Sequence, residues 1–111
     1  MARRKGGLFG GLDPLALIQQ LQAQLDQVQK EIAQTEVEGS AGGGAVRVVM
    51  RGDHKVVRIH IEPELLAEGD TEMLQDLLIT AFNNAVAEVK RITEEKMGPI
   101  QKSLGSLGLP F

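Results

Sequence analysis

Four of the six residues in the stretch 39–44 are glycine, and this stretch separates two different hydrophobic patterns. Upstream of it, apolar residues recur with helical spacing. Downstream of it, apolar and polar residues alternate. Glycine weakens the interior of helices and strands, but it permits the backbone conformations that tight bends need. The stretch therefore predicts a bend, which we expect to let a long first helix leave a small sheet.

The upstream pattern is an apolar seam in a segment that begins with Asp13 and Pro14, which are typical of a helix N-cap and first helical position. The seam residues are spaced by three and four positions, as in a coiled coil. They are Ile18, Leu21, Leu25, Val28 and Ile32.

A helix over about residues 13–36 would be roughly 35 Å long. That length exceeds the ~26 Å diameter of a compact domain of about 100 residues. Part of this helix should therefore project, and its seam requires a partner. The partner is either a second long helix of the same chain or another copy of the chain, and we expect a homodimer.

The downstream pattern predicts strands within about residues 36–61. Residues 46–51 and 56–61 alternate between apolar and polar side chains, and residues 52–55 are typical of a turn. Two strands alone are marginally stable in water. Residues 35–41 can supply a third strand, with the glycines at 42–44 as the bend.

A second long helix is predicted over about residues 70–97, with Asp70 as its N-cap. An apolar stripe on this helix should cover the sheet. Its members are Leu74, Leu77, Leu78, Ala81, Phe82, Ala85, Val86 and Val89. Gly98 and Pro99 predict a stop or a kink. The fold class is therefore α+β, with a domain over 13–102, a flexible basic arm over 1–12 and a flexible tail over 103–111.

Several classes of function find no support in the sequence. The chain has no cysteine, and its two histidines lack the spacing of metal ligands. The glycine stretch lacks the Gly-Lys-Ser/Thr ending of a phosphate-binding loop, and it precedes a strand where such a loop would open a helix. No apolar run approaches the roughly 20 residues of a membrane span. We expect a cytoplasmic protein that is not an enzyme, with no cofactor, metal, membrane contact or small-molecule substrate.

Charge is distributed unevenly along the chain, although the formal net charge is only −3. Residues 62–88 contain seven acidic residues and no basic residue. The basic residues lie elsewhere, where they could contact the phosphates of a nucleic acid. One group lies in the N-terminal segment 1–12 and in the helices: Arg3, Arg4, Lys5, Lys30, Lys90, Arg91 and Lys96. A competing group lies on the strands: Arg47, Arg51, Lys55 and Arg58.

An ordered series of segments resembles the YbaB/EbfC family of bacterial nucleoid-associated proteins. The series comprises residues 18–30, 37–48, 61–66, 72–85, 95–98 and 108–111. The resemblance implies an α+β fold with a three-stranded antiparallel sheet, and a homodimer whose paired helices project like tweezers. It also implies binding of double-stranded DNA and a place in the nucleoid. The sequence departs from the family in its seam, where the family often has methionine, and in its more basic turn at 51–55.

We therefore predict a nucleoid-associated protein that binds double-stranded DNA as a homodimer and contributes to nucleoid organisation and gene regulation. Neither a helix-turn-helix nor a zinc-finger pattern is present, so phosphate contacts with little sequence specificity are expected. The alternative is a protein-interaction scaffold of the bacterial cytoplasm with little direct affinity for DNA. The acidic net charge and the unpartnered seam favour this alternative.

Overall fold

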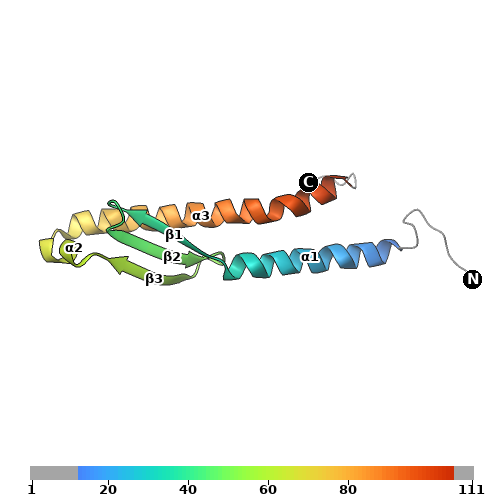
Figure 1. Cartoon of the computed structure of the whole chain (residues 1–111), viewed down its shortest axis with the longest axis horizontal. Coiled ribbons are helices and arrows are strands. Elements are labelled where there is room, and N and C mark those ends of the chain that lie inside the picture. Colours follow the sequence, from blue (N-terminus) through green and yellow to red (C-terminus); the bar gives the residue numbers. More distant parts are fainter. Residues whose placement is uncertain (1–12, 107–111) are drawn as a thin grey trace, which may run out of the picture.

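Two long helices and a three-stranded sheet form the α+β fold of this chain, in a computed structural model that describes residues 13–106 (Figure 1). The elements are α1 (Pro14–Gln34), β1 (Glu36–Ala41), β2 (Val46–Arg51), β3 (Val56–Ile61), α2 (Pro63–Glu68) and α3 (Thr71–Ser106). The molecule measures 79 × 21 × 16 Å, with a radius of gyration of 22.0 Å. A compact domain of this size would have about 13 Å. The excess arises because α1 and the outer part of α3 extend beyond the sheet in the same direction.

The sheet is antiparallel with strand order β1-β2-β3. Its first turn contains Gly42, Gly43 and Gly44, whose φ angles of 64°, 68° and 94° lie in the region that favours glycine. The predicted bend is thus confirmed as the turn from β1 to β2. The expectation that this bend releases the first helix is wrong, because α1 leaves the sheet at the opposite end of β1.

A single residue, Thr35, joins α1 to β1. Its backbone N–H donates to the carbonyls of Glu31 and Ile32 at 3.0 and 3.1 Å, and its hydroxyl donates to the Glu31 carbonyl at 2.6 Å. The N–H of Gly52, in the β2–β3 turn, donates to the Thr35 carbonyl at 3.0 Å. Gly52 lies so close to the Ile32 carbonyl that a Cβ atom would overlap it. The end of α1 is therefore fixed directly to the sheet.

The core lies between α3 and the first two strands. Val46 and Val48 of β2 and Ala81 and Ala85 of α3 are fully buried. Gly39 of β1 lies directly against the α3 backbone, where a Cβ atom would overlap Ala81 and Ala85. These small residues allow the helix and β1 to approach closely.

Helix α3 covers β1 and β2 but leaves β3 exposed. A helix is about 10 Å across and strands are about 4.8 Å apart, so one helix spans two strands. The predicted apolar stripe therefore covers only part of the sheet. Val86, a member of that stripe, is exposed on the flank of α3.

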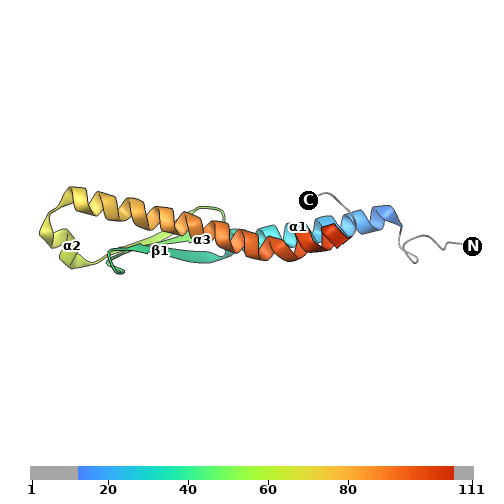
Figure 2. The ribbon, with the colours of Figure 1, turned by 90° about the horizontal axis from the view of Figure 1, so that it is seen from above.

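Helix α3 continues through Gly98 and Pro99 to Ser106, so the predicted end at about residue 97 is wrong. Met97 and Ile100 are half-buried on this outer part. Figures 1 and 2 both show the outer part of α3 running beside α1. Packing against α1 thus accounts for a helix that the local sequence disfavours. Residues 103–106 of the predicted tail are helical, while 107–111 lie outside the described residues.

Candidate nucleic-acid interface

The two long helices α1 and α3, which we call the arms, carry the predicted basic residues of the helical group. Lys30 on α1 and Lys90 on α3 are exposed, and Lys96 is half-buried. At 3.6 residues per turn, Lys90 and Lys96 lie about 120° apart around α3. The basic residues of α3 therefore do not form one patch. Arg3, Arg4 and Lys5 lie outside the described residues.

Arg91 differs from the lysines because two carboxylates bind it. Its Nε donates to Glu88 at 3.2 Å and its Nη1 donates to Glu95 at 2.9 Å. Across residues 13–106, by contrast, no ion pair involves Lys30, Lys90 or Lys96. These three lysines are the cations of the arms that remain available for an external anion.

The strand group lies on the outer face of the sheet, which is the face turned away from α3. Arg47 and Arg51 alternate on β2 with the buried residues, and Arg58 occupies the same face of β3. Lys55 lies in the β2–β3 turn, where its backbone N–H donates to Asp53 Oδ1 at 3.0 Å. The structure thus brings these strand residues together, as the alternation predicted.

Acidic side chains that the sequence did not assign to this face lie among those arginines. Glu36 and Glu38 point outward from β1, and Glu36 lies 3.8 Å from Arg58. Arg51 lies 3.7 Å from Asp53 in the same way. A hollow of about 280 Å³ on this face is lined by Glu38, Arg47, Val49, Arg58 and His60. The outer face is therefore mixed in charge, and only the strand register reveals it.

An apolar surface follows the uncovered side of α3 and the neighbouring strand. We call it the β3 flank, and its exposed or half-buried members are Val57, Ile59, Ile79, Phe82 and Val86. Ile59 is 45% exposed and Ile79 is 58% exposed. An apolar surface of this kind is typical of a protein contact. Sequence reasoning missed it because it assumed that α3 covers all three strands.

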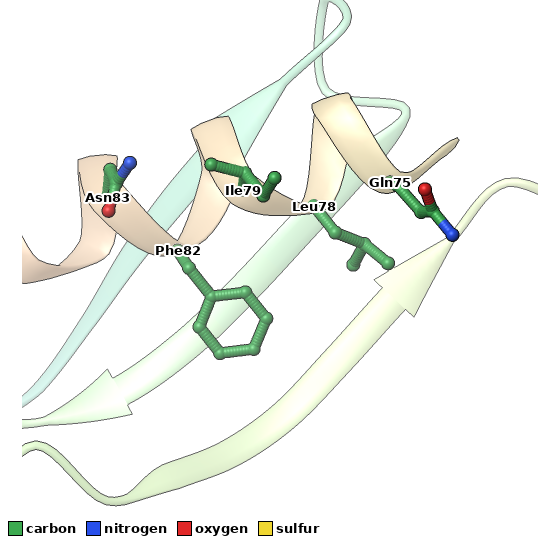
Figure 3. Close-up of a pocket in the computed structure, with 5 residues that line it drawn as sticks. All are labelled: Gln75, Leu78, Ile79, Phe82 and Asn83. Carbon is green, nitrogen blue, oxygen red and sulfur yellow. The ribbon is translucent and has the colours of Figure 1, made fainter. Parts of the chain in front are cut away.

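The β3 flank is hollowed beside α3 (Figure 3). The hollow has a volume of about 490 Å³ and is lined by Gln75, Leu78, Ile79, Phe82 and Asn83. Figure 3 shows Leu78 and Phe82 extending from α3 toward the sheet on the β3 side. The hollow is therefore apolar at its base, with two polar amides at its ends.

The predicted helix-pairing seam of α1 is covered unevenly. Ile32 is buried at the sheet end, and Leu21, Leu25 and Val28 are half-buried. Ile18, near the free end, is 52% exposed. The α3 helix of the same chain thus supplies a partner for the inner seam and leaves the outer end uncovered.

Two features are absent from the part of the chain that the structure describes. No three histidine or acidic side chains gather there in a way that could hold a metal ion. None of the helices between residues 13 and 106 is long and apolar enough to cross a membrane.

Comparison with known proteins gives consistent results. The model of the YbaB/EbfC DNA-binding family matches residues 11–104. A nucleoid-associated protein of Mycolicibacterium vanbaalenii is 43% identical over 96 residues, which are 86% of this chain and 87% of the relative. A nucleoid-associated protein of Chloroflexus aurantiacus is 45% identical over 93 residues, covering 84% of this chain and 93% of the relative.

The fold also resembles a solved structure. The crystal structure of an uncharacterized protein from Helicobacter pylori superposes with a TM-score of 0.58 at 25% sequence identity. The match covers 71% of this chain and 92% of that chain.

Proposed function

This chain belongs to the YbaB/EbfC DNA-binding family, and from that membership we propose that it binds double-stranded DNA as a homodimer in the bacterial nucleoid. The family match over residues 11–104 is the observation that carries this proposal. Relatives that bear the name nucleoid-associated protein support the nucleoid as its location. Its proposed role is to organise the nucleoid and thereby to influence gene expression.

The β3 flank is the proposed dimer interface. A second copy placed there would remove Ile59 and Ile79 from water, and it would also cover the outer edge of β3. Open strand edges and apolar surfaces are both unfavourable in a soluble monomer. A two-fold contact would use the same surface on both copies, so each copy would cover the other. The dimer would then present each arm twice.

The arms are the proposed DNA-binding elements. Lys30, Lys90 and Lys96 lie outside the acidic stretch 62–88, which occupies α2 and the first half of α3. Lysine contacts to phosphates release counterions and add affinity with little sequence information. On the outer face of the sheet, carboxylates lie beside Arg51 and Arg58, which favours the arms over that face.

Charge reversal tests this proposal in a duplex gel-shift titration. One variant combines Lys30→Glu, Lys90→Glu and Lys96→Glu, and a second combines Arg47→Glu and Arg58→Glu on the sheet. We expect the arm variant to lose DNA retention and the sheet variant to keep most of it. Light scattering should give both variants the mass of the unaltered protein.

The other outcomes assign the function differently. Loss of DNA retention only in the sheet variant would move the interface to the outer face of the sheet. If both variants keep the DNA affinity of the unaltered protein, phosphate contacts from these residues do not hold DNA. If the unaltered protein itself fails to retain duplex DNA, the scaffold alternative is supported.

A further inference from the structure

The free end of α1 is apolar and uncharged. We call residues 14–25 the arm tip; this segment contains no acidic or basic residue. Leu15 is 64% exposed and Ile18 is 52% exposed. Farther along the seam of α1, Leu21, Leu25 and Val28 are half-buried and Ile32 is buried, so the seam is least covered at this end.

Neither of the proposed activities uses the arm tip. The first basic residue of α1 is Lys30, so the tip offers no cation to a phosphate. The tip also lies at the far end of a 79 Å molecule from the turn between β3 and α2 (Figure 1). It is therefore separate from the β3 flank that we assign to the dimer.

We propose that the arm tips of two dimers pair with each other and so join dimers that are bound to DNA. The proposal rests on the proposed function, because it takes DNA-bound dimers as the units that become linked. The occupant of each tip is the tip of a second copy of this chain.

The tip itself favours a second copy as its occupant. Ile18 belongs to a seam with three- and four-residue spacing, which fits a helix with the same spacing, and Leu15 lies about 60° around the helix from it. A symmetric pair would place Leu15 and Ile18 of each copy against the same residues of the other. Residues 14–25 are uncharged, so no like charges within the tip itself would oppose this contact. Glutamines beside the seam, such as Gln22, can form hydrogen bonds at its margin.

The contact is small, so it should be weak between free dimers. Binding to one DNA molecule raises the effective concentration of the dimers, and linked weak contacts then gain strength without new interactions. Because each dimer carries two tips, paired tips would connect dimers on the same duplex or on two duplexes. The proposal therefore predicts that the protein bridges separate DNA molecules.

A bridging assay tests this prediction. One duplex is immobilised, a second labelled duplex is added, and the labelled DNA that the protein retains is measured. We expect Ile18→Glu to reduce retention by about tenfold or more, because a buried charge opposes tip pairing. Gln20→Glu is the matched control, since it adds the same charge to an exposed position about 140–160° around the helix from Leu15 and Ile18. It should bridge like the unaltered protein.

Two measurements on the same variants separate this proposal from the proposed function. Gel shift with a single duplex and light scattering of the free protein should be unchanged by Ile18→Glu. Bridging by Ile18→Glu at the level of the control would overturn tip pairing. A fall to monomer mass would also overturn it, because the tip would then belong to the dimer interface.

Cross-linking tests the pairing without DNA. The chain has no cysteine, so Gln22→Cys introduces one thiol per chain beside the seam, and Gln34→Cys provides the same probe at the inner end of α1. With a short bismaleimide at high protein concentration, we expect linked chains from Gln22→Cys only. The linked product should have the native mass of four chains. Equal linking at both positions, no linking at either, or a native mass of two chains would contradict the proposal.

Discussion

At the scale of single residues, two glycines hold the sheet to the helices. Gly39 lets α3 lie against β1, and Gly52 lets the end of α1 lie against the β2–β3 turn. At both positions a neighbouring backbone occupies the space that a Cβ atom would need. Backbone cannot move aside as a flexible side chain can. Gly43 and Gly98, in contrast, have no atom within 4 Å of the place where a Cβ would lie. The sequence does not distinguish these two kinds of glycine.

Gly39→Ala should therefore destabilise the protein strongly. The added methyl group would overlap backbone atoms of Ala81 and Ala85, and we expect a loss of about 3 kcal/mol in the free energy of unfolding. Urea denaturation followed by circular dichroism measures this value. Gly98→Ala is the control, because it adds the same methyl group to an open helical site and should stabilise by up to about 1 kcal/mol. Equal effects of the two changes would contradict the close packing at Gly39.

His54 has a φ of 67°, the only positive value among the described non-glycine residues. A side chain in this left-handed region costs about 1–2 kcal/mol. Glycine removes that cost but gains freedom in the unfolded chain, so we expect His54→Gly to stabilise by about 0.5 kcal/mol. Thermal unfolding measures the change. A lower melting temperature than that of the unaltered protein would show that the imidazole makes a contact that outweighs the strain.

At the scale of elements, local patterns predicted much of the secondary structure. The seam spacing indicated α1, and Asp13 and Asp70 cap their helices through hydrogen bonds of 2.6 and 3.0 Å, as predicted. Patterns could not show which strands α3 covers, because that depends on the width of a helix relative to the sheet. Nor could they place Glu36 beside Arg58, which requires the pairing register of three strands.

Among the candidate DNA contacts, the sequence shows which residues are basic and not which are paired. Arg91 and Lys90 are adjacent, yet only Arg91 is bound by carboxylates from the neighbouring turns of α3. The same helix continues through Pro99, although proline disfavours a helix interior, because its outer part packs beside α1.

Replacing that proline should strengthen the outer part of α3. Pro99 lacks an N–H and disturbs the preceding turn, so Pro99→Ala should stabilise the local helix by about 1–3 kcal/mol. Hydrogen exchange of the amides in the last turns of α3 measures this change as slower exchange. Gln101→Ala, at an exposed position nearby, should have little effect. Unchanged exchange in Pro99→Ala would show that α3 already opens there for another reason.

At the scale of the whole molecule, the elongated shape places Lys30 and Lys96 away from the apolar flank beside the sheet, while Lys90 lies one helical turn from Val86 at the end of that flank. The two surfaces should therefore respond to different substitutions. Substitutions on the β3 flank should change assembly without altering the charge contacts of the arms. Substitutions of the arm lysines should change affinity for DNA without altering assembly.

Ile79→Glu should convert the proposed homodimer into a monomer, because it places a charge in the centre of the β3 flank. Sedimentation measured over a range of concentrations gives the mass. Thr80→Glu is the control, since it adds the same charge to the exposed neighbouring residue of α3. A dimer that persists in Ile79→Glu would place the interface elsewhere.

DNA affinity should fall steeply with salt. Three arm lysines in each of two subunits give about six phosphate contacts, which predicts a loss of about 10³-fold in affinity between 50 and 200 mM salt. Fluorescence anisotropy with a labelled duplex at several salt concentrations measures the slope. A nearly flat dependence would show that phosphate contacts do not dominate binding.

The one-residue junction at Thr35 makes α1 a lever. The final turn of α1 accepts hydrogen bonds from Thr35, and Thr35 in turn accepts one from Gly52. The helix therefore has no hinge at its base, and its 21 residues extend about 31 Å from that fixed point. A tilt of about 5° at the junction would displace the free end by almost 3 Å. A few atoms at Thr35 and Gly52 therefore set the direction of α1. Small displacements of these atoms would shift the whole outer part of the helix.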